Sequence, residues 1–363
     1  MEDLKNKLLE NINQITDSDL NITLGELNSV NEIVLTDNAI QVYLELVQPI
    51  HWIYSEIKKK VKSILDEVAP NLKHEIFISE KPMNLTNRQT LKNVKNLIAV
   101  ASGKGGVGKS SMAANIAAGL MMQGAAVGIL DADVYGPSQP TMFGLEGRKL
   151  MAIQTQDGRS MAQPIEQYGV KVASMGFIMN REEAAIVRGP MLAGYFSMLF
   201  EQVEWGELDF LVFDLPPGTG DIQLTLVQKI PLTGAVIITT PQDIALADVR
   251  RSIAMFEKTK VDIVGIVENM SYFTPPELPD NKYYIFGEGG GQKIADEFGV
   301  NLLGEVPLDL EMREANDAGR PVILNSEDTI HNTAIRNIVR NIVTETRRLN
   351  YKSMNATVPS ISI

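Results

Sequence analysis

The chain has 363 residues, 44% of them hydrophobic and 21% charged, a composition typical of a globular protein with a substantial core. It contains no cysteine, which excludes disulfide bonds, thiolate metal sites and cysteine nucleophiles. The net charge of −12 argues against sequence-independent nucleic-acid binding, because neutralising phosphates requires clustered lysine and arginine.

No apolar run is long enough to cross a bilayer, and residues 1–14 lack the basic stretch and apolar core of a secretory signal. We therefore expect a cytoplasmic protein with neither a membrane nor a nucleic-acid partner. The histidines His51, His74 and His331 are far apart and have no ligand-like spacing, so we expect them to be structural or exposed.

Residues 1–80 predict a small α+β domain. Apolar periodicity indicates helices over 4–16 and 53–68. The same analysis indicates strands over 30–35, 40–46 and 75–78. Residues 81–96 are mostly polar, and we expect them to form a linker.

Short apolar strands alternate with helices over residues 97–349. The strand segments read LIAVAS, AVGIL, FLVFD, AVIITT, DIVGIVEN and NLLGEVP. Unbroken apolar runs are typical of strands buried on both faces, and their alternation with helices predicts a doubly wound α/β domain with a mostly parallel sheet. Residues 350–363 lack helical periodicity, and we expect a flexible tail there.

The segment GKGGVGKS, residues 103–110, fits the phosphate-loop pattern G-x-x-x-x-G-K-[ST] between an apolar strand and an amphipathic helix. Its glycines let backbone N–H groups approach phosphates, and the helix N-terminus adds positive potential. We expect Lys109 to reach the outer phosphates of ATP and the Ser110 hydroxyl to ligate Mg²⁺. The predicted nucleotide contacts are Gly103, Lys104, Gly105, Gly106, Val107, Gly108, Lys109, Ser110 and Ser111.

Three aspartates follow buried strands, at the sheet edge where ligands bind in open α/β folds. Asp131 and Asp133 follow the second core strand, and we expect Asp131 to organise Mg²⁺ and Asp133 to position the attacking water. Asp214 ends the strand FLVFD and is expected to hold Mg²⁺ through water. A lone aspartate after a strand is more often a helix cap, so this interpretation depends on the nearby phosphate loop.

The early lysine of KGGVGKS, Lys104, resembles that of the deviant phosphate-loop ATPases of the ParA/MinD class. The resemblance implies a homodimer in which this lysine reaches across the interface to the partner's phosphates. Lys104 is then expected to neutralise transition-state charge in trans, as an arginine finger does.

Longer segments resemble the Mrp/ApbC branch, ATPases that carry iron–sulfur clusters. These segments read DADVYGPSQPTMFG, RGPML, WGELDFLVFDLPPGTGDIQLTL, TTPQDIALADVRR and GIVENMSYF. The branch implies Mg²⁺-dependent ATP hydrolysis, with apo iron–sulfur proteins or assembly factors as clients. It also implies that Asn269 recognises adenine and that the loop around Pro307 closes over the base. Residues 1–80 resemble the small MIP18-like domain of many bacterial members.

The sequence departs from the branch after ENMSYF, where a Cys-x-x-Cys pair usually supplies thiolates to a cluster shared by two subunits. Pro275 and Leu278 stand at those positions, and neither side chain can donate electrons to iron. A cluster would therefore need ligands from Glu277, Asp280, a partner protein or small thiols.

Three interpretations remain open from the sequence. The protein carries a cluster on such unusual ligands; it is an ATP-gated dimer that serves cluster assembly without holding metal; or it is a ParA/MinD-like positioning ATPase that binds a protein client, DNA or membrane. The acidic charge counts against the third. The aromatic residues Tyr283, Tyr284 and Phe286 either form a client-contact patch or pack on the domain's own sheet.

Overall fold

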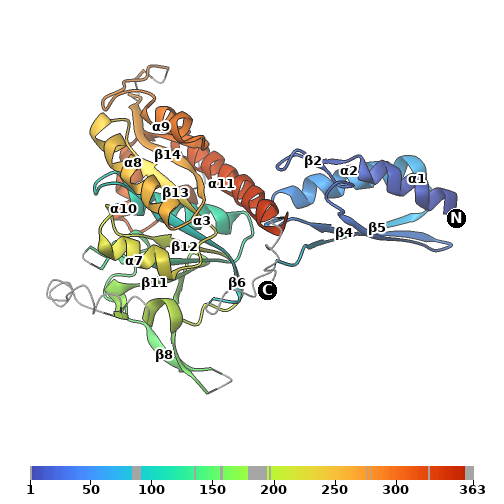
Figure 1. The fold of residues 1–363 in the computed structure, drawn as a ribbon, viewed down its shortest axis with the longest axis horizontal. Coiled ribbons are helices and arrows are strands. Elements are labelled where there is room, and N and C mark those ends of the chain that lie inside the picture. The colour runs from blue at the N-terminus through green and yellow to red at the C-terminus, as the bar shows by residue number, and fades with distance from the viewer. Residues whose placement is uncertain are drawn as a thin grey trace, which may run out of the picture. The chain divides into compact units, whose positions relative to one another are not determined.

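The computed structural model describes residues 2–83, 91–134, 136–155, 158–178, 194–195, 198–275, 277–278, 280–325 and 328–355. The chain forms two compact units, one combining Met1–Asn84 with Val343–Ile363 and the other comprising Leu85–Ile342. Figure 1 shows the course of the chain through both units. Outside the described residues lie the segment RGPML, residues 84–90 of the predicted linker and residues 356–363 of the predicted tail.

The first unit is built around a three-stranded sheet of β3 (Val30–Leu35), β4 (Ala39–Leu46) and β5 (Lys73–Glu80). β4 is central, antiparallel to β3 and parallel to β5. Every second residue of β4 is buried, because alternate residues of a strand share one face. The helix α2 (Ile53–Val68) buries a stripe at four-residue spacing, which consists of Ile53, Ile57, Val61 and Leu65.

The structure confirms the predicted helix 53–68 and strands 30–35 and 40–46. The predicted helix 4–16 is instead α1 (Glu2–Asn13). It ends early because Thr16 pairs with Thr23 in the short ladder of β1 (Thr16–Asp17) and β2 (Ile22–Thr23).

A buried arginine ties the end of the chain into this unit. Arg347, in α11 (Ile330–Asn355), is fully buried and donates hydrogen bonds of 2.6 to 2.9 Å to Asp17 and Asp19. Burial alone would lower the pKa of Arg347, but the hydrogen bonds to Asp17 and the charges of both aspartates raise it. The guanidinium group therefore stays charged inside the protein.

The expected start of a flexible tail at residue 350 is wrong, because α11 continues to Asn355. Asn350 is buried and donates a hydrogen bond of 3.0 Å to the Gln48 carbonyl oxygen. Packing of the helix within the first unit thus outweighs the weak helical periodicity of this segment.

We expect Arg347→Met to lower the free energy of unfolding of the first unit by about 3–5 kcal/mol, because two buried carboxylates lose their counter-charge. Urea unfolding of the full chain carrying Trp205→Phe measures this, since Trp52, in the first unit, is then the only tryptophan. The control Lys60→Ala removes an exposed pair with Glu56 and should cost less than about 1 kcal/mol. Equal midpoints for the two variants would contradict the prediction.

The second unit contains an eight-stranded sheet in which all neighbours except β10 and β11 are parallel. This confirms the predicted doubly wound α/β class. Across the sheet the strands are β10 (Ile165–Gln167), β11 (Val170–Ser174), β7 (Val127–Asp131), β12 (Leu208–Asp214), β6 (Val94–Ala101), β13 (Gly234–Thr239), β14 (Ile263–Phe273) and β15 (Leu302–Leu308).

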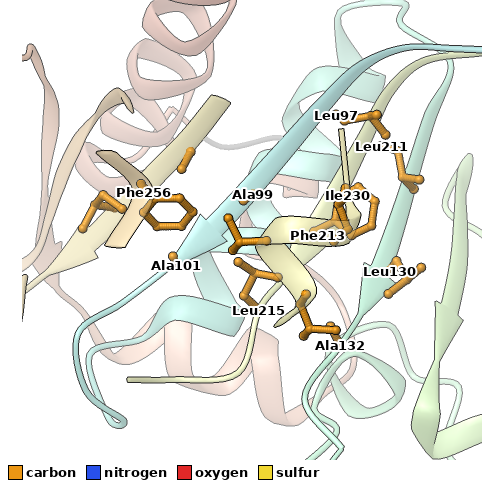
Figure 2. Packing of buried hydrophobic residues seen from close by; sticks show 14 of the residues in the cluster. Leu97, Ala99, Ala101, Leu130, Ala132, Leu211, Phe213, Leu215, Ile230 and Phe256 are labelled. Atoms are coloured by element: carbon orange, nitrogen blue, oxygen red, sulfur yellow. The ribbon is translucent and has the colours of Figure 1, made fainter. Parts of the chain in front are cut away.

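Helices cover the sheet and bury its strands. Apolar residues of β6, β12 and β13 share one cluster with residues of α7 (Asp221–Lys229), α8 (Asp243–Lys258) and α9 (Gly290–Phe298). Figure 2 shows part of this cluster, including Leu97, Ala99, Phe213 and Phe256. The remaining described elements of the unit are α4 (Gln139–Met142), β8 (Met151–Gln154), β9 (Ser160–Gln163), α10 (Leu310–Asp317) and the short 3₁₀ turns Met175–Phe177 and Val322–Leu324.

The sequence predicted an amphipathic helix after the phosphate loop, and this prediction is wrong. The helix, α3 (Lys109–Met122), is instead buried almost all round. It packs against β6, β7 and β12. It also packs against α11, since a Cβ at Gly119 would lie 2.7 Å from Val339. A helix enclosed in this way has almost no solvent face, and its four alanines leave room for the neighbouring elements to pack closely.

The parallel strands place their carboxyl ends along one edge of the sheet. In the ladder Asp214 lies opposite both Asp131 of β7 and Val100 of β6. The phosphate loop follows β6 at the same edge, so the register brings the sequence motifs together. In the part of the chain that the structure describes, no helix is long and apolar enough to span a membrane.

Candidate functional site

The phosphate loop, residues 103–110, joins β6 to α3 and needs glycine at two positions for different reasons. Gly108 has a φ of 80°, a left-handed conformation, and a Cβ there would lie 2.2 Å from Asn269 Nδ2. Gly103 packs against α8, where a Cβ would lie 2.4 Å from the backbone carbonyl carbon of Asp248. The loop is therefore held tightly between β14 and α8.

Lys109 and Asp214 form a buried ion pair next to this loop. Lys109 Nζ donates a hydrogen bond to Asp214 Oδ1, and the two side chains are 6% and 0% exposed. Lys109 Nζ also donates to Ser110 Oγ at 3.1 Å. Asp131, opposite Asp214 in the ladder, is fully buried as well. The structure thus brings together four residues that the sequence assigned to phosphate and Mg²⁺ binding.

The buried group contains two carboxylates but only one ammonium group. Burial and the nearby charge of Asp214 raise the pKa of Asp131, while hydrogen bonds from the backbone N–H groups of Gln139 and Asp133 and the charge of Lys109 lower it. A cation beside these carboxylates would relieve their repulsion. With the Ser110 hydroxyl as a neutral oxygen donor, the residues present fit Mg²⁺.

Asp131 also organises the loop that follows β7. Its oxygens accept hydrogen bonds from the backbone N–H groups of Asp133, Ser138 and Gln139 at 3.1, 2.9 and 3.0 Å. The Ser174 hydroxyl donates a further bond of 3.0 Å. Asp133 is half-buried on this loop, and its role in positioning water stays a prediction.

Sequence reasoning missed Gln139, although it lies in the quoted segment DADVYGPSQPTMFG. Its side chain is buried, and Nε2 donates to Asp214 Oδ2 at 2.8 Å and to the Ser110 carbonyl oxygen at 3.0 Å. Gln139 therefore links Asp214, the carboxylate expected to hold Mg²⁺, to the phosphate loop. No motif spacing marks it, because the contact arises only from the order of the strands.

A cavity of about 260 Å³ adjoins the phosphate loop and is lined by the two predicted base-site residues, Asn269 and Pro307. Asn269 Nδ2 donates to the Val107 carbonyl oxygen at 2.9 Å, and its buried Oδ1 has no hydrogen-bond partner among the described residues. Asn316, which the sequence analysis missed, donates to Ser111 Oγ at 2.8 Å, and its Oδ1 has no described partner either. Two unpaired acceptors suit a ligand with N–H donors, such as the amino group of adenine.

Lys104 is half-buried and contacts a different element from Lys109. Its Nζ lies 3.4 Å from Gln242 Oε1, at the N-terminus of α8. A hydrogen bond of this length is weak. The side chain is thus held only loosely within its own chain, and its action in trans stays a prediction.

The loop after β14 carries no thiolate. Pro275 is half-buried, whereas Glu277, Leu278 and Asp280 are exposed. Glu277 and Asp280 belong to no group of three metal-ligand side chains among the described residues. The residues present therefore do not fit an iron–sulfur cluster held by this chain's own side chains in the usual way.

The aromatic residues further along this loop are largely accessible. Tyr283 and Tyr284 are 47% and 41% exposed, whereas Phe286 is half-buried; the intervening Ile285 is 58% exposed. Tyr284 touches Tyr272 edge-on at 6.4 Å between ring centroids. The loop thus exposes apolar side chains, while the Tyr284 ring packs against Tyr272 of β14.

The phosphate loop between a central parallel strand and a buried helix, with carboxylates at the neighbouring strand ends, defines a P-loop NTPase. The fold is similar to that of the Pyrococcus furiosus cell division ATPase MinD, with a TM-score of 0.51 at 19% identity, covering 68% of this chain and 98% of that chain. A nucleotide-binding protein from Archaeoglobus fulgidus, solved in complex with ADP, is 40% identical, with a TM-score of 0.57, covering 64% of this chain and 90% of that chain.

Residues 93–343 match the family described as "ParA: NUBPL iron-transfer P-loop NTPase", and the chain belongs to this family. The iron–sulfur cluster carrier protein of Synechocystis sp. is 42% identical over 334 residues, 90% of this chain and 94% of the relative. The iron–sulfur cluster transfer protein NUBPL of Dictyostelium discoideum is 45% identical over 260 residues, 72% of this chain and 79% of the relative. The resemblance inferred from the sequence motifs is confirmed.

We expect Asn269→Ala to lower the affinity for Mg·ADP by about 1–2 kcal/mol while leaving the affinity for Mg·GDP nearly unchanged, because only adenine loses a partner. Titration with fluorescent ADP and GDP derivatives measures both affinities. The exposed Asn281→Ala serves as the control. A parallel loss for both nucleotides would mean that Asn269 only supports the phosphate loop.

Proposed function

We propose that this chain is a Mg²⁺-dependent ATPase that acts in the assembly or transfer of iron–sulfur clusters. The observation that carries the proposal is the buried group of Lys109, Asp214 and Asp131 at a phosphate loop, in a chain of the iron-transfer family. The ADP complex of the Archaeoglobus relative supports an adenine nucleotide as the ligand. Apo iron–sulfur proteins or assembly factors are the proposed clients.

Nucleotide binding is proposed to exchange the partners of Lys109. Without nucleotide its ammonium group neutralises Asp214. The outer phosphates of ATP carry more charge and would draw Lys109 toward them. Asp214, Ser110 and Asp131 would then hold Mg²⁺, which would neutralise charge on the phosphates. Asp133, whose backbone N–H donates to Asp131, is proposed to orient the attacking water.

We propose that hydrolysis requires a homodimer in which Lys104 completes the partner's site. The weak contact of Lys104 with Gln242 supports this, because little must be lost for the side chain to turn to another subunit. The added positive charge would stabilise the transition state of phosphoryl transfer.

Two inactive variants can test the dimer. We expect Lys104→Ala to bind Mg·ATP normally but to hydrolyse it at least about 10²-fold more slowly, as loss of a trans-acting cation does. Lys109→Met should lose binding. Mixing the two should restore part of the activity, because a mixed dimer joins an intact phosphate loop to an intact Lys104.

The exposed Lys258→Ala is the matched control and should behave like the parent chain. Unchanged hydrolysis by Lys104→Ala would show that this lysine has no trans role. Normal affinity in Lys109→Met would refute the assignment of the phosphate loop itself.

We propose that this chain acts in cluster assembly or transfer without binding the cluster through thiolates of its own. After anaerobic incubation with iron and sulfide, we expect the purified protein to retain ATPase activity but to hold no stable sulfide-containing cluster. Visible absorption and bound iron and sulfide per chain measure this. Pro275→Cys combined with Leu278→Cys is the positive control, since it supplies thiolates at the two positions where the family usually has cysteine.

A stable cluster in the parent chain that can be transferred to an apo-ferredoxin would contradict this expectation. The protein would then be a carrier with unusual ligands. Glu277→Gln and Asp280→Asn would next show whether those carboxylates hold the iron.

A further inference from the structure

Three ligand-type side chains meet just beyond the carboxyl end of β15, and no step proposed above uses them. Asp309 is the N-cap of α10, Glu311 lies in the first turn of that helix, and His331 lies in the first turn of α11. One oxygen of each carboxylate and one ring nitrogen of His331 lie within 4.8 Å of one another. The topology of the second unit therefore joins residues that the sequence keeps apart.

The two carboxylates face different nitrogens of the same imidazole ring. His331 Nδ1 lies 3.4 Å from Asp309 Oδ2, whereas Nε2 lies 3.3 Å from Glu311 Oε2 and 2.9 Å from Thr329 Oγ1. One imidazole nitrogen and one oxygen of each carboxylate nevertheless lie within 4.8 Å of one another. Two ligands about 2.1 Å from a tetrahedral metal ion are about 3.4 Å apart, so metal binding requires one carboxylate to turn toward the nitrogen that the other already faces.

Separate hydrogen bonds hold the other oxygen of each carboxylate. Asp309 Oδ1 accepts from the Glu311 backbone N–H at 2.7 Å, and Glu311 Oε1 accepts from Asn325 Nδ2 at 2.9 Å. Outer contacts of this kind orient the carboxylates that ligate metals. They leave Asp309 Oδ2 and Glu311 Oε2 turned toward the imidazole.

A cavity of about 250 Å³ opens at this cluster and is lined by all three residues together with Thr274 and Pro275. The His331 side chain is 2% exposed, whereas those of Asp309 and Glu311 are 38% and 35% exposed. The imidazole is thus anchored in the interior while the carboxylates reach the cavity. Space remains on the cavity side for water or a further donor.

We propose that Asp309, Glu311 and His331 bind a divalent first-row transition-metal ion, such as Zn²⁺ or Fe²⁺, in this cavity. One imidazole nitrogen with two carboxylate oxygens suits these ions, whereas Mg²⁺ prefers oxygen ligands alone. The two carboxylates balance the charge of the ion. Three protein ligands leave at least one coordination position open.

This metal site is distinct from the Mg²⁺ position beside Asp214 and stands independently of the proposed function. A chain that hydrolyses no ATP could still bind the ion, and a chain without the ion could still hydrolyse ATP. The two proposals therefore fail separately.

The test uses the full chain, freed of metal with a chelator and kept in excess Mg²⁺ without nucleotide. Zn²⁺ is titrated in competition with a chromophoric chelator, and Co²⁺ absorption serves as a second probe. We expect one Zn²⁺ per chain. Asp309→Asn, Glu311→Gln and His331→Gln should each weaken binding more than about tenfold. Asparagine still caps a helix, and glutamine still accepts from Asn325, so the fold should be kept.

Glu314→Gln, on the exposed side of the same helix, and His74→Gln, beside Asp66 in the first unit, are the matched controls and should bind Zn²⁺ like the parent. The proposal is overturned if the parent binds no stoichiometric Zn²⁺. It is also overturned if the three variants keep the parent's affinity for Zn²⁺, or if the two controls lose as much Zn²⁺ affinity as the variants do. The cluster would then only link the beginnings of two helices through polar contacts.

Discussion

The second unit depends on burying two carboxylates, Asp214 and Asp131, side by side with one lysine. Taking charged groups out of water is costly, and it is tolerated only when each is paired and hydrogen-bonded. Lys109 supplies the counter-charge, while Gln139 and backbone N–H groups satisfy the remaining oxygens. The register of β7, β12 and β6 fixes all of these groups, so the strand order that builds the core also builds the site.

The same charge balance makes the site responsive to its ligand. Lys109 cannot serve Asp214 and a phosphate equally well, so in the proposed mechanism the arrival of a nucleotide changes the partners of Asp214 and, through Gln139, the loop after β7. Low dielectric strengthens each of these interactions, and a small displacement therefore carries a large electrostatic cost. A buried, coupled set of charges can thus act as a switch, whereas exposed pairs would be screened.

The sequence predicted those parts of the site whose chemistry is local. The phosphate loop was found because its residues are contiguous, and Asp131 and Asp214 because each ends an apolar strand at a known edge. Gln139, Asn316 and the cluster around His331 were missed, since their contacts cross long stretches of chain and leave no periodicity. Spacing alone predicts that His331 is structural or exposed, and the structure buries it between two carboxylates where α10 and α11 begin.

The fold constrains the buried phosphate-loop site more strongly than the loop after β14, where the family usually has cysteine. Changing Lys109 or Asp214 would strand a buried charge, so these positions are tightly constrained by folding as well as by chemistry. Pro275 and Leu278 sit on a partly or fully exposed loop, where replacement of a thiol costs the fold little. The buried phosphate-loop site can therefore persist in a chain that has no thiolate ligands for a cluster. Family membership supports the ATP-driven step more strongly than it supports direct cluster binding, because only the former is built into the core.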